Sequence, residues 1–233
     1  MINTVAILPV RAKDLMGKQN QIAQVGEIDL LSRAIKSALS SERVDMLCVS
    51  TDSAEIAEMA KGLGAEAPFL RPDKIGKGIE TGPTILYYTI KELERHFGAQ
   101  IETVVSLSCH YPFRPTELID QVINLFQEKR FDTVFTVKET TGNYWYKDTE
   151  GKVVRIFREN YYIPRDDREP LYRELFGLVC VTGRKWLSDK SMIGESIGVV
   201  PVHDLTSLID LRDPVWKQLH EQIDLSVLDR DFM

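Results

Sequence analysis

The chain has 233 residues, of which 43% are hydrophobic and 27% charged, as is usual for a globular protein. Its net charge of -6 comes without any basic block, which argues against broad nucleic-acid binding. No segment approaches the roughly 20 apolar residues of a membrane span, and the amino terminus lacks a basic leader. We therefore expect a cytoplasmic protein with a single domain over residues 1–233.

The cysteines and histidines argue against a disulfide framework and against a zinc centre. Cys48, Cys109 and Cys180 are odd in number, widely spaced and placed in apolar, strand-like contexts. We interpret them as buried free thiols in a reducing compartment. The four histidines form neither an HxH nor an HExxH pattern, so a dedicated zinc site is not expected.

Apolar runs alternate with helical patterns up to residue 137. The expected strands are 4–10, 44–50, 103–107 and 133–137, and the expected helices are 30–38, 54–63, 83–97 and 118–126. The segments between them are polar loops, apart from a short extended segment at 66–70. This alternation predicts an α/β fold with a mostly parallel sheet that helices cover on both faces. In such sheets ligands bind beyond the carboxyl ends of the strands.

The alternation stops after residue 137. Residues 144–157 predict a β-hairpin with a turn at Glu150-Gly151, and residues 158–174 are rich in Arg, Asp and Tyr but have little periodicity. Because long loops in compact domains are usually functional or interfacial, we interpret 138–175 as an arm. Strands at 177–181 and 197–202 and a helix at 214–223 are expected to complete the fold.

Two strand ends carry polar residues that suit a ligand site. Residues 50–52 are Ser, Thr and Asp, and capping of the next helix by Asp52 or Ser53 is a sufficient explanation for them. The loop at 7–20 carries Arg11, Lys13 and Lys18, which together could neutralise a phosphate chain. It lacks the GxxxxGK[ST] pattern, and taken alone it is better explained as a solvated basic loop.

Five segments in the same order resemble the acylneuraminate cytidylyltransferase family, the CMP-sialic acid synthetases, and more distantly the synthetases that activate Kdo. The resemblance extends from about Val5 to Ile223. The matching segments are Pro9-Val10-Arg11 with Lys13 to Lys18, Val49 to Ala57 with Gly64 to Pro72, Leu107 to Arg114, Tyr172 to Gly177, and Ser207 to Asp213.

The resemblance implies a three-layer, Rossmann-like nucleotidyltransferase fold with an inserted dimerisation arm at 138–175. It implies a reaction in which the anomeric hydroxyl of a 2-keto sugar acid attacks the α-phosphate of CTP, giving a CMP-sugar and pyrophosphate. It further implies Mg²⁺ as the cofactor and a homodimer formed through the arm. Cations and Mg²⁺ suit such a reaction because charge accumulates on the phosphates in the transition state.

Roles for individual residues follow from the matched positions. The implied catalytic residues are Arg11, Lys18 and Asp210. The implied nucleotide-binding residues are Arg11, Lys13, Lys18, Asn20, Arg71, Glu80 and Thr81. The implied sugar-binding residues are Ser108, His110, Arg165 and Glu174, the last two from the same or a partner subunit. The implied metal ligands are Asp210 and Asp213. His110 is also a candidate for removing the proton of the sugar hydroxyl.

The chain departs from the family pattern at places that matter for this chemistry. The loop between Arg11 and Lys13 is two residues short, and residues 108–110 are Ser-Cys-His where the family has Gln-Pro-Thr. Arg212 stands where the family has its second metal-binding aspartate, with Asp213 one position later. Two alternatives therefore stay open: a nucleotidyltransferase of the same fold with another nucleotide or sugar, and a non-catalytic binding protein.

Overall fold

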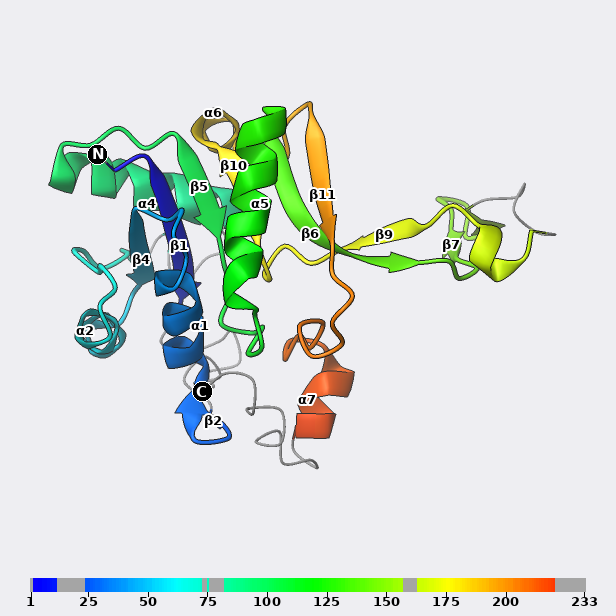
Figure 1. Cartoon of the computed structure of the whole chain (residues 1–233), viewed down its shortest axis with the longest axis horizontal. Coiled ribbons are helices and arrows are strands. Elements are labelled where there is room, and N and C mark those ends of the chain that lie inside the picture. The colour runs from blue at the N-terminus through cyan, green and yellow to red at the C-terminus, as the bar shows by residue number, and fades with distance from the viewer. Residues whose placement is uncertain (1, 12–23, 73–74, 76–81, 157–162, 221–233) are drawn as a thin grey trace.

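The computed structural model describes residues 2–11, 24–72, 75, 82–156 and 163–220 (Figure 1). Its centre is a sheet with the strand order β11-β6-β10-β5-β1-β4. In that order the strands span Ile197–Pro201, Thr133–Thr140, Cys180–Gly183, Thr103–Ser106, Thr4–Val10 and Met46–Thr51. A further strand, β9 (Leu171–Glu174), pairs with β6 outside this path.

The sheet is mostly parallel, so the expected α/β class is confirmed. β1 pairs in parallel with β4 and with β5, and β11 pairs in parallel with β6. β10 runs antiparallel to both of its neighbours, β5 and β6. Because β1 lies between β4 and β5, the carboxyl ends of these three strands meet at one edge of the sheet, where ligands of parallel sheets bind.

Helices cover both faces of the sheet, which gives three layers (Figure 1). One face packs against α1, α2 and α5, and the other packs against α4 and α6. A last helix, α7, lies near the carboxyl edge. The helices span Leu30–Leu39 (α1), Ala54–Gly62 (α2), Gly82–Phe97 (α4), Thr116–Lys129 (α5), Arg184–Ser188 (α6) and Pro214–His220 (α7).

The alternation of side chains along β1 divides the core between the two faces. Ala6, Leu8 and Val10 belong to the larger cluster with α1, α2 and α5, whereas Val5 and Ile7 belong to the cluster with α4 and α6. All five side chains are fully buried. A strand buried on both faces is expected to be mostly apolar, as this one is from Val5 to Val10.

Side-chain caps determine where two helices begin. Asp29 accepts a hydrogen bond from the backbone nitrogen of Ser32 at 2.8 Å and caps α1. Of the two candidate caps for α2, the structure uses Ser53, whose hydroxyl accepts from the backbone nitrogen of Ile56 at 3.3 Å. Both caps satisfy an amide that has no partner within the helix.

An arm projects from the sheet on the side of β6 (Figure 1). The outer part of β6 pairs with β9 in antiparallel register, from Val137 opposite Glu174 to Thr140 opposite Leu171. Beyond it, β7 (Trp145–Lys147) and β8 (Val153–Arg155) form the expected hairpin. Gly151 has a φ of 81°, a left-handed conformation that glycine adopts without steric cost, in the turn of that hairpin.

The structure differs from the sequence expectations in several connections. The segment 158–174 contains the strand β9, and the loop at 11–29 contains a small hairpin of β2 (Gln24–Val25) and β3 (Ile28–Asp29). The strand expected at 177–181 is Cys180–Gly183 instead, and α6 was not expected. Of the described helices, none has the length and apolar character that a membrane crossing requires.

Candidate active site

Arg71 joins the carboxyl ends of β1 and β4. Its Nη1 donates to the carbonyl oxygen of Ser50 at 2.7 Å, and its Nη2 donates to the carbonyl oxygen of Val10 at 2.9 Å. Its backbone nitrogen donates to the carbonyl oxygen of Thr51 at 2.7 Å. The side chain is only 3% exposed. These bonds tie the segment after α2 to the ends of β1 and β4, which explains why the chain returns to the core immediately after α2.

Burial and neighbouring charges at this edge of the sheet determine the pKa of Arg71. Burial lowers the pKa of Arg71 to about 10, an effect that the carboxylate of Asp52 opposes and the charge of Arg11 reinforces. Arg71 therefore stays protonated at neutral pH. Its Nε is buried and has no hydrogen-bond partner among the described residues. Arg11 directly follows β1, and its charge repels that of Arg71, so these two predicted nucleotide-binding cations lie near each other.

The remaining predicted nucleotide-binding residues lie outside the described part of the chain. They are Lys13, Lys18, Asn20, Glu80 and Thr81. Their assigned roles stay predictions.

A second buried arginine fixes the loop that follows β5. Arg114 is 1% exposed; its Nε donates to the carbonyl oxygen of Leu178 at 2.6 Å, and its Nη2 donates to those of Ser108 at 2.6 Å and Gly177 at 3.1 Å. The backbone nitrogen of Ser108 also donates to the carbonyl oxygen of Gly177 at 2.8 Å. Burial lowers the pKa of Arg114 to about 10. The predicted sugar-facing loop is thus held rigidly against the segment that leads into β10.

Ser108 and His110, two predicted sugar-binding residues, lie in this loop beside the segment at 210–212. The backbone nitrogen of His110 donates to the hydroxyl of Ser108 at 3.2 Å, and its carbonyl oxygen accepts from the backbone nitrogen of Leu211 at 2.9 Å. Burial lowers the pKa of His110, and the charge of Arg212 lowers it further, against the opposing charge of Asp210. The imidazole is therefore neutral at neutral pH and able to accept a proton.

Asp210 forms a close ion pair with Arg212. The Nε of Arg212 donates to Oδ1 at 2.9 Å and to Oδ2 at 3.2 Å, and its Nη2 donates to Oδ2 at 2.7 Å. Burial acts to raise the pKa of Asp210, but the hydrogen bonds and charge of Arg212 outweigh it and lower the pKa. The same hydrogen bonds raise the pKa of Arg212. The Asp210 side chain is 19% exposed and that of Arg212 is 50% exposed.

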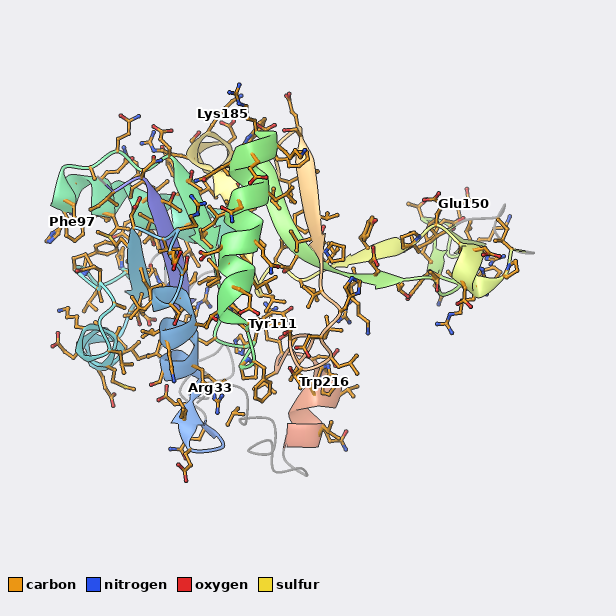
Figure 2. All side chains as sticks on the ribbon, in the orientation of Figure 1. Arg33, Phe97, Tyr111, Glu150, Lys185 and Trp216 are labelled. Atoms are coloured by element: carbon orange, nitrogen blue, oxygen red, sulfur yellow. The ribbon has the colours of Figure 1, made fainter. Side chains whose placement is uncertain are left out.

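Tyr111 and Gly177 complete this cluster. The guanidinium of Arg212 lies 5.5 Å from the centre of the Tyr111 ring, and Figure 2 shows Tyr111 at the end of α5 that faces α7. Burial raises the pKa of Tyr111 to about 12, and the nearby charge of Asp210 adds to this. A Cβ added to Gly177 would lie 2.8 Å from Cε2 of Tyr111 and 3.0 Å from Nη2 of Arg212. Only glycine fits this close approach without a shift of the neighbours.

The described residues do not form a ready site for a resident divalent cation. Both oxygens of Asp210 accept from Arg212, and Oδ1 of Asp213 accepts from the backbone nitrogen of Val215 at 3.0 Å, where it caps α7. Within 2–11, 24–72, 75, 82–156 and 163–220 there is no group of three or more His, Cys, Asp or Glu side chains that could hold a metal ion. The assignment of Asp210 and Asp213 as metal ligands stays a prediction.

The other two predicted sugar-binding residues lie on the arm. Arg165 belongs to the short 3-10 helix η3 (Arg165–Asp167), and Glu174 ends β9. Both side chains are exposed. Figure 1 shows the outer part of the arm, with η3, away from the carboxyl edge of its own sheet. Within one chain, Arg165 is therefore not brought together with the Asp210–Arg212 pair.

Three residues that the sequence analysis gave no role in the site organise it. Arg114, Tyr111 and Gly177 all occur in the segments that carry the family resemblance. A buried arginine or a glycine does not change the spacing of apolar residues. The signal that could have identified these residues was therefore their position in a segment that matches the family. Arg33, another buried arginine, likewise binds the carbonyl oxygen of Val25 at 2.6 Å.

A cleft of about 480 Å³ opens between α1 and the start of α5. Its described lining includes Arg33 and Lys36 but also Glu117 and Asp204, so its charges are mixed. None of the predicted site residues is among the described residues that line it. The predicted site is instead the edge of the sheet that carries Arg71 and the Asp210–Arg212 pair.

Comparison with known proteins agrees with this fold along most of the chain. The CMP-N,N'-diacetyllegionaminic acid synthase of Legionella pneumophila is 24% identical over 227 residues, which cover 94% of each chain. The pseudaminic acid cytidylyltransferase of Campylobacter jejuni (serotype O:2) is 24% identical over 223 residues, or 90% of this chain and 94% of the other.

Two solved structures share the fold. CMP:2-keto-3-deoxy-manno-octonic acid synthetase complexed with CTP superposes with a TM-score of 0.63 at 11% identity, over 95% of this chain and all of the other. The 4-diphosphocytidyl-2C-methyl-D-erythritol synthase of Anaerococcus prevotii superposes with a TM-score of 0.66 at 14% identity, over 98% and 99%. The sequence model of the family described as cytidylyltransferase matches residues 6–174. The chain belongs to the cytidylyltransferase family.

Proposed function

We propose that the protein transfers a cytidylyl group from CTP to the anomeric hydroxyl of a sialic-acid-like 2-keto sugar acid. One observation carries the proposal. At the carboxyl edge of the parallel sheet, Arg11 follows β1 and Arg71 is bound to the ends of β1 and β4, on the same side as Ser108, His110 and Arg212. The relatives named CMP-N,N'-diacetyllegionaminic acid synthase and pseudaminic acid cytidylyltransferase, which match 94% and 90% of this chain, support the choice of sugar class.

The arrangement suits an attack on the α-phosphorus of a nucleoside triphosphate. The sugar hydroxyl oxygen forms the new bond to phosphorus while the bond to pyrophosphate breaks. Neutral His110 can accept the hydroxyl proton, since burial and the charge of Arg212 keep it deprotonated. Arg11 and Arg71 would then offset the negative charge that grows on the phosphate oxygens.

Mg²⁺ is part of the proposal as an ion that arrives with the triphosphate. Mg²⁺ usually takes only one or two protein carboxylates beside phosphate oxygens and waters, so it needs no preformed protein centre. Its charge would polarise the phosphates. The described residues would orient the substrates and offset part of their negative charge.

The arm supports a proposed homodimer. Several of its large apolar side chains are half exposed, and a groove of about 400 Å³ runs along it beside Tyr172. An exposed apolar surface of this kind marks an interaction site. In a dimer, Arg165 and Glu174 could reach the sugar of the partner subunit. The three buried free cysteines fit a cytoplasmic, reducing location.

The test is release of pyrophosphate in the presence of Mg²⁺, each of the four nucleoside triphosphates, and a panel of sialic, legionaminic and pseudaminic acids and Kdo. Release with CTP and one sugar acid would establish the reaction and name the sugar. Release with another nucleotide would move the protein to a different nucleotidyltransferase activity. No release with any pair, and no thermal shift with any nucleotide, would overturn the proposal in favour of a non-catalytic binding protein.

A further inference from the structure

The Asp210–Arg212 pair gives the sugar-facing edge an unusual charge balance. One carboxylate and one guanidinium sum to zero without any bound ion. Two carboxylates at the same place would reach zero only after binding a divalent cation. Because both oxygens of Asp210 already accept hydrogen bonds from Arg212, a cation would have to compete with a bidentate partner.

Arg212 is held in place yet remains reachable. Its Nε and Nη2 bind Asp210, its guanidinium lies 5.5 Å from the centre of the Tyr111 ring, and a Cβ added to Gly177 would lie 3.0 Å from Nη2. Half of the side chain is nevertheless exposed. Its hydrogen bonds to Asp210 use the backbone nitrogen, Nε and Nη2, and the half-exposed guanidinium can still be reached by a ligand. A fixed guanidinium is suited to phosphate and carboxylate oxygens.

We propose that Arg212, oriented by Asp210 and Tyr111, is the fixed positive charge of this edge and binds an anionic group of the substrate directly. The nucleotide-free protein then holds no divalent cation at Asp210. The identity of the substrate rests on the proposed function. The charge assignment, by which we mean that Arg212 and not a metal ion at Asp210 supplies the positive charge, does not rest on it. The anionic group is either a phosphate of the nucleotide or the carboxylate of the sugar acid.

The first experiment measures Mn²⁺ binding to the nucleotide-free protein by electron paramagnetic resonance. Wild type and Asp210→Asn are expected to bind Mn²⁺ alike. Arg212→Asp creates a carboxylate pair and is expected to bind Mn²⁺ about tenfold tighter or more, a gain that the double variant with Asp210→Asn loses. Wild-type binding that Asp210→Asn removes, or no gain in Arg212→Asp, would overturn the charge assignment.

The second experiment measures binding of CTP and of N-acetylneuraminic acid by calorimetry in EDTA. Loss of one charge-assisted hydrogen bond in Arg212→Ala is expected to weaken one of the two ligands about tenfold or more, which also identifies the anionic group. Arg212→Lys keeps the charge but not the planar fork, so an intermediate affinity is expected. Unchanged affinity for both ligands in Arg212→Ala would overturn direct binding.

Arg95→Ala is the matched control, because Arg95 also pairs with a nearby carboxylate, that of Glu92, but on the exposed surface of α4. It is expected to bind all ligands as wild type does. Thermal unfolding of each variant shows whether it is folded. If folded wild type binds neither CTP nor the sugar acid, the proposed function fails, while the Mn²⁺ comparison still decides the charge assignment.

Discussion

Arg71 donates a hydrogen bond from Nη2 to the carbonyl oxygen of Val10 at 2.9 Å, although 61 positions separate the two residues in the chain. A second bond from Nη1 to Ser50 fixes the end of the neighbouring strand. Arg71 therefore has a structural role as well as the predicted role in nucleotide binding. Both roles arise because Arg71 lies at the carboxyl ends of two adjacent parallel strands.

Replacing Arg71 with methionine is expected to lower the free energy of unfolding by about 3 kcal/mol, because two buried carbonyl oxygens lose charged partners. For a chain of this size that corresponds to a decrease in Tm of about 10 °C. Urea and thermal unfolding measure both quantities. Arg43→Met changes an exposed side chain and should stay within about 0.5 kcal/mol of wild type. An Arg71→Met variant as stable as wild type would refute the structural role.

Replacing Gly177 with alanine is expected to reduce activity far more than stability. The new Cβ would meet Tyr111 and Ser108 at 2.8 and 3.0 Å, as well as Arg212, so these groups must shift. A misplacement of about 1 Å in a site can cost about a hundredfold in rate, which is the loss expected for kcat/KM. Steady-state kinetics beside thermal unfolding measure the two effects.

Gly62→Ala is the matched control for that substitution. Gly62 ends α2, and a Cβ there would meet nothing within 4 Å. Alanine has a higher helix propensity than glycine, so this variant should be as stable as wild type or slightly more stable, with unchanged activity. Equal activity in Gly62→Ala and Gly177→Ala would show that the close contact at Gly177 is not needed.

The sequence predicted most of the longer elements that bury at least one face. β1 is apolar from Val5 onward because the sheet buries it on both faces, and the helices α1 and α5 show one apolar stripe each. β9 was missed because most of its side chains, such as Tyr172, are exposed on the arm, so no apolar period marks it. β9 pairs with β6 because the chain turns back within the arm, and the spacing of apolar residues gives no sign of such a turn.

The site was predictable residue by residue but not as a set of contacts. Resemblance pointed to Ser108, His110 and Asp210, and the structure brings these three close together. The ion pair of Asp210 with Arg212 could not be foreseen, because it depends on a tight turn in which the backbone nitrogen of Arg212 also donates to Oδ1 of Asp210. Such a pair follows from local geometry, and composition alone does not reveal it.

Glu94 is expected to make stability depend on pH in the acid range. Its carboxylate accepts from Nη2 of Arg184 at 2.8 Å and from the backbone nitrogen of Ile101 at 3.2 Å. Burial acts to raise the pKa of Glu94, but these bonds and the charges of Arg184 and Lys91 lower it below 4.5. The unfolded chain therefore takes up the proton first, so this stabilisation is present above pH 4.5 and is lost as the pH falls through the folded pKa.

Glu94→Gln should therefore cost about 1 kcal/mol at pH 7, and the difference from wild type should shrink at pH 3. Urea unfolding at the two pH values measures it. Glu58→Gln is the control, because Glu58 pairs with Lys61 on an exposed surface, where ion pairs contribute little. A constant difference between wild type and Glu94→Gln at both pH values would contradict this assignment.

The arm is expected to carry the dimer contact. Trp145 on β7 and Tyr172 on β9 are 57% and 50% exposed, and burying such aromatic side chains against a second copy would stabilise association. Sedimentation velocity should therefore find a dimer for wild type and a monomer for the double variant Trp145→Asp, Tyr172→Asp, since charges at the centre of an apolar interface are costly.

Leu205→Asp provides the control for that experiment. Leu205 is 74% exposed but lies after β11 on the body of the protein, so this variant should dimerise as wild type does. If the arm also brings Arg165 and Glu174 to the partner's sugar, the monomeric arm variant should lose affinity for the sugar acid while keeping affinity for CTP. A monomeric wild type would exclude the proposed dimer. An arm variant that still dimerises would show that the dimer contact lies elsewhere.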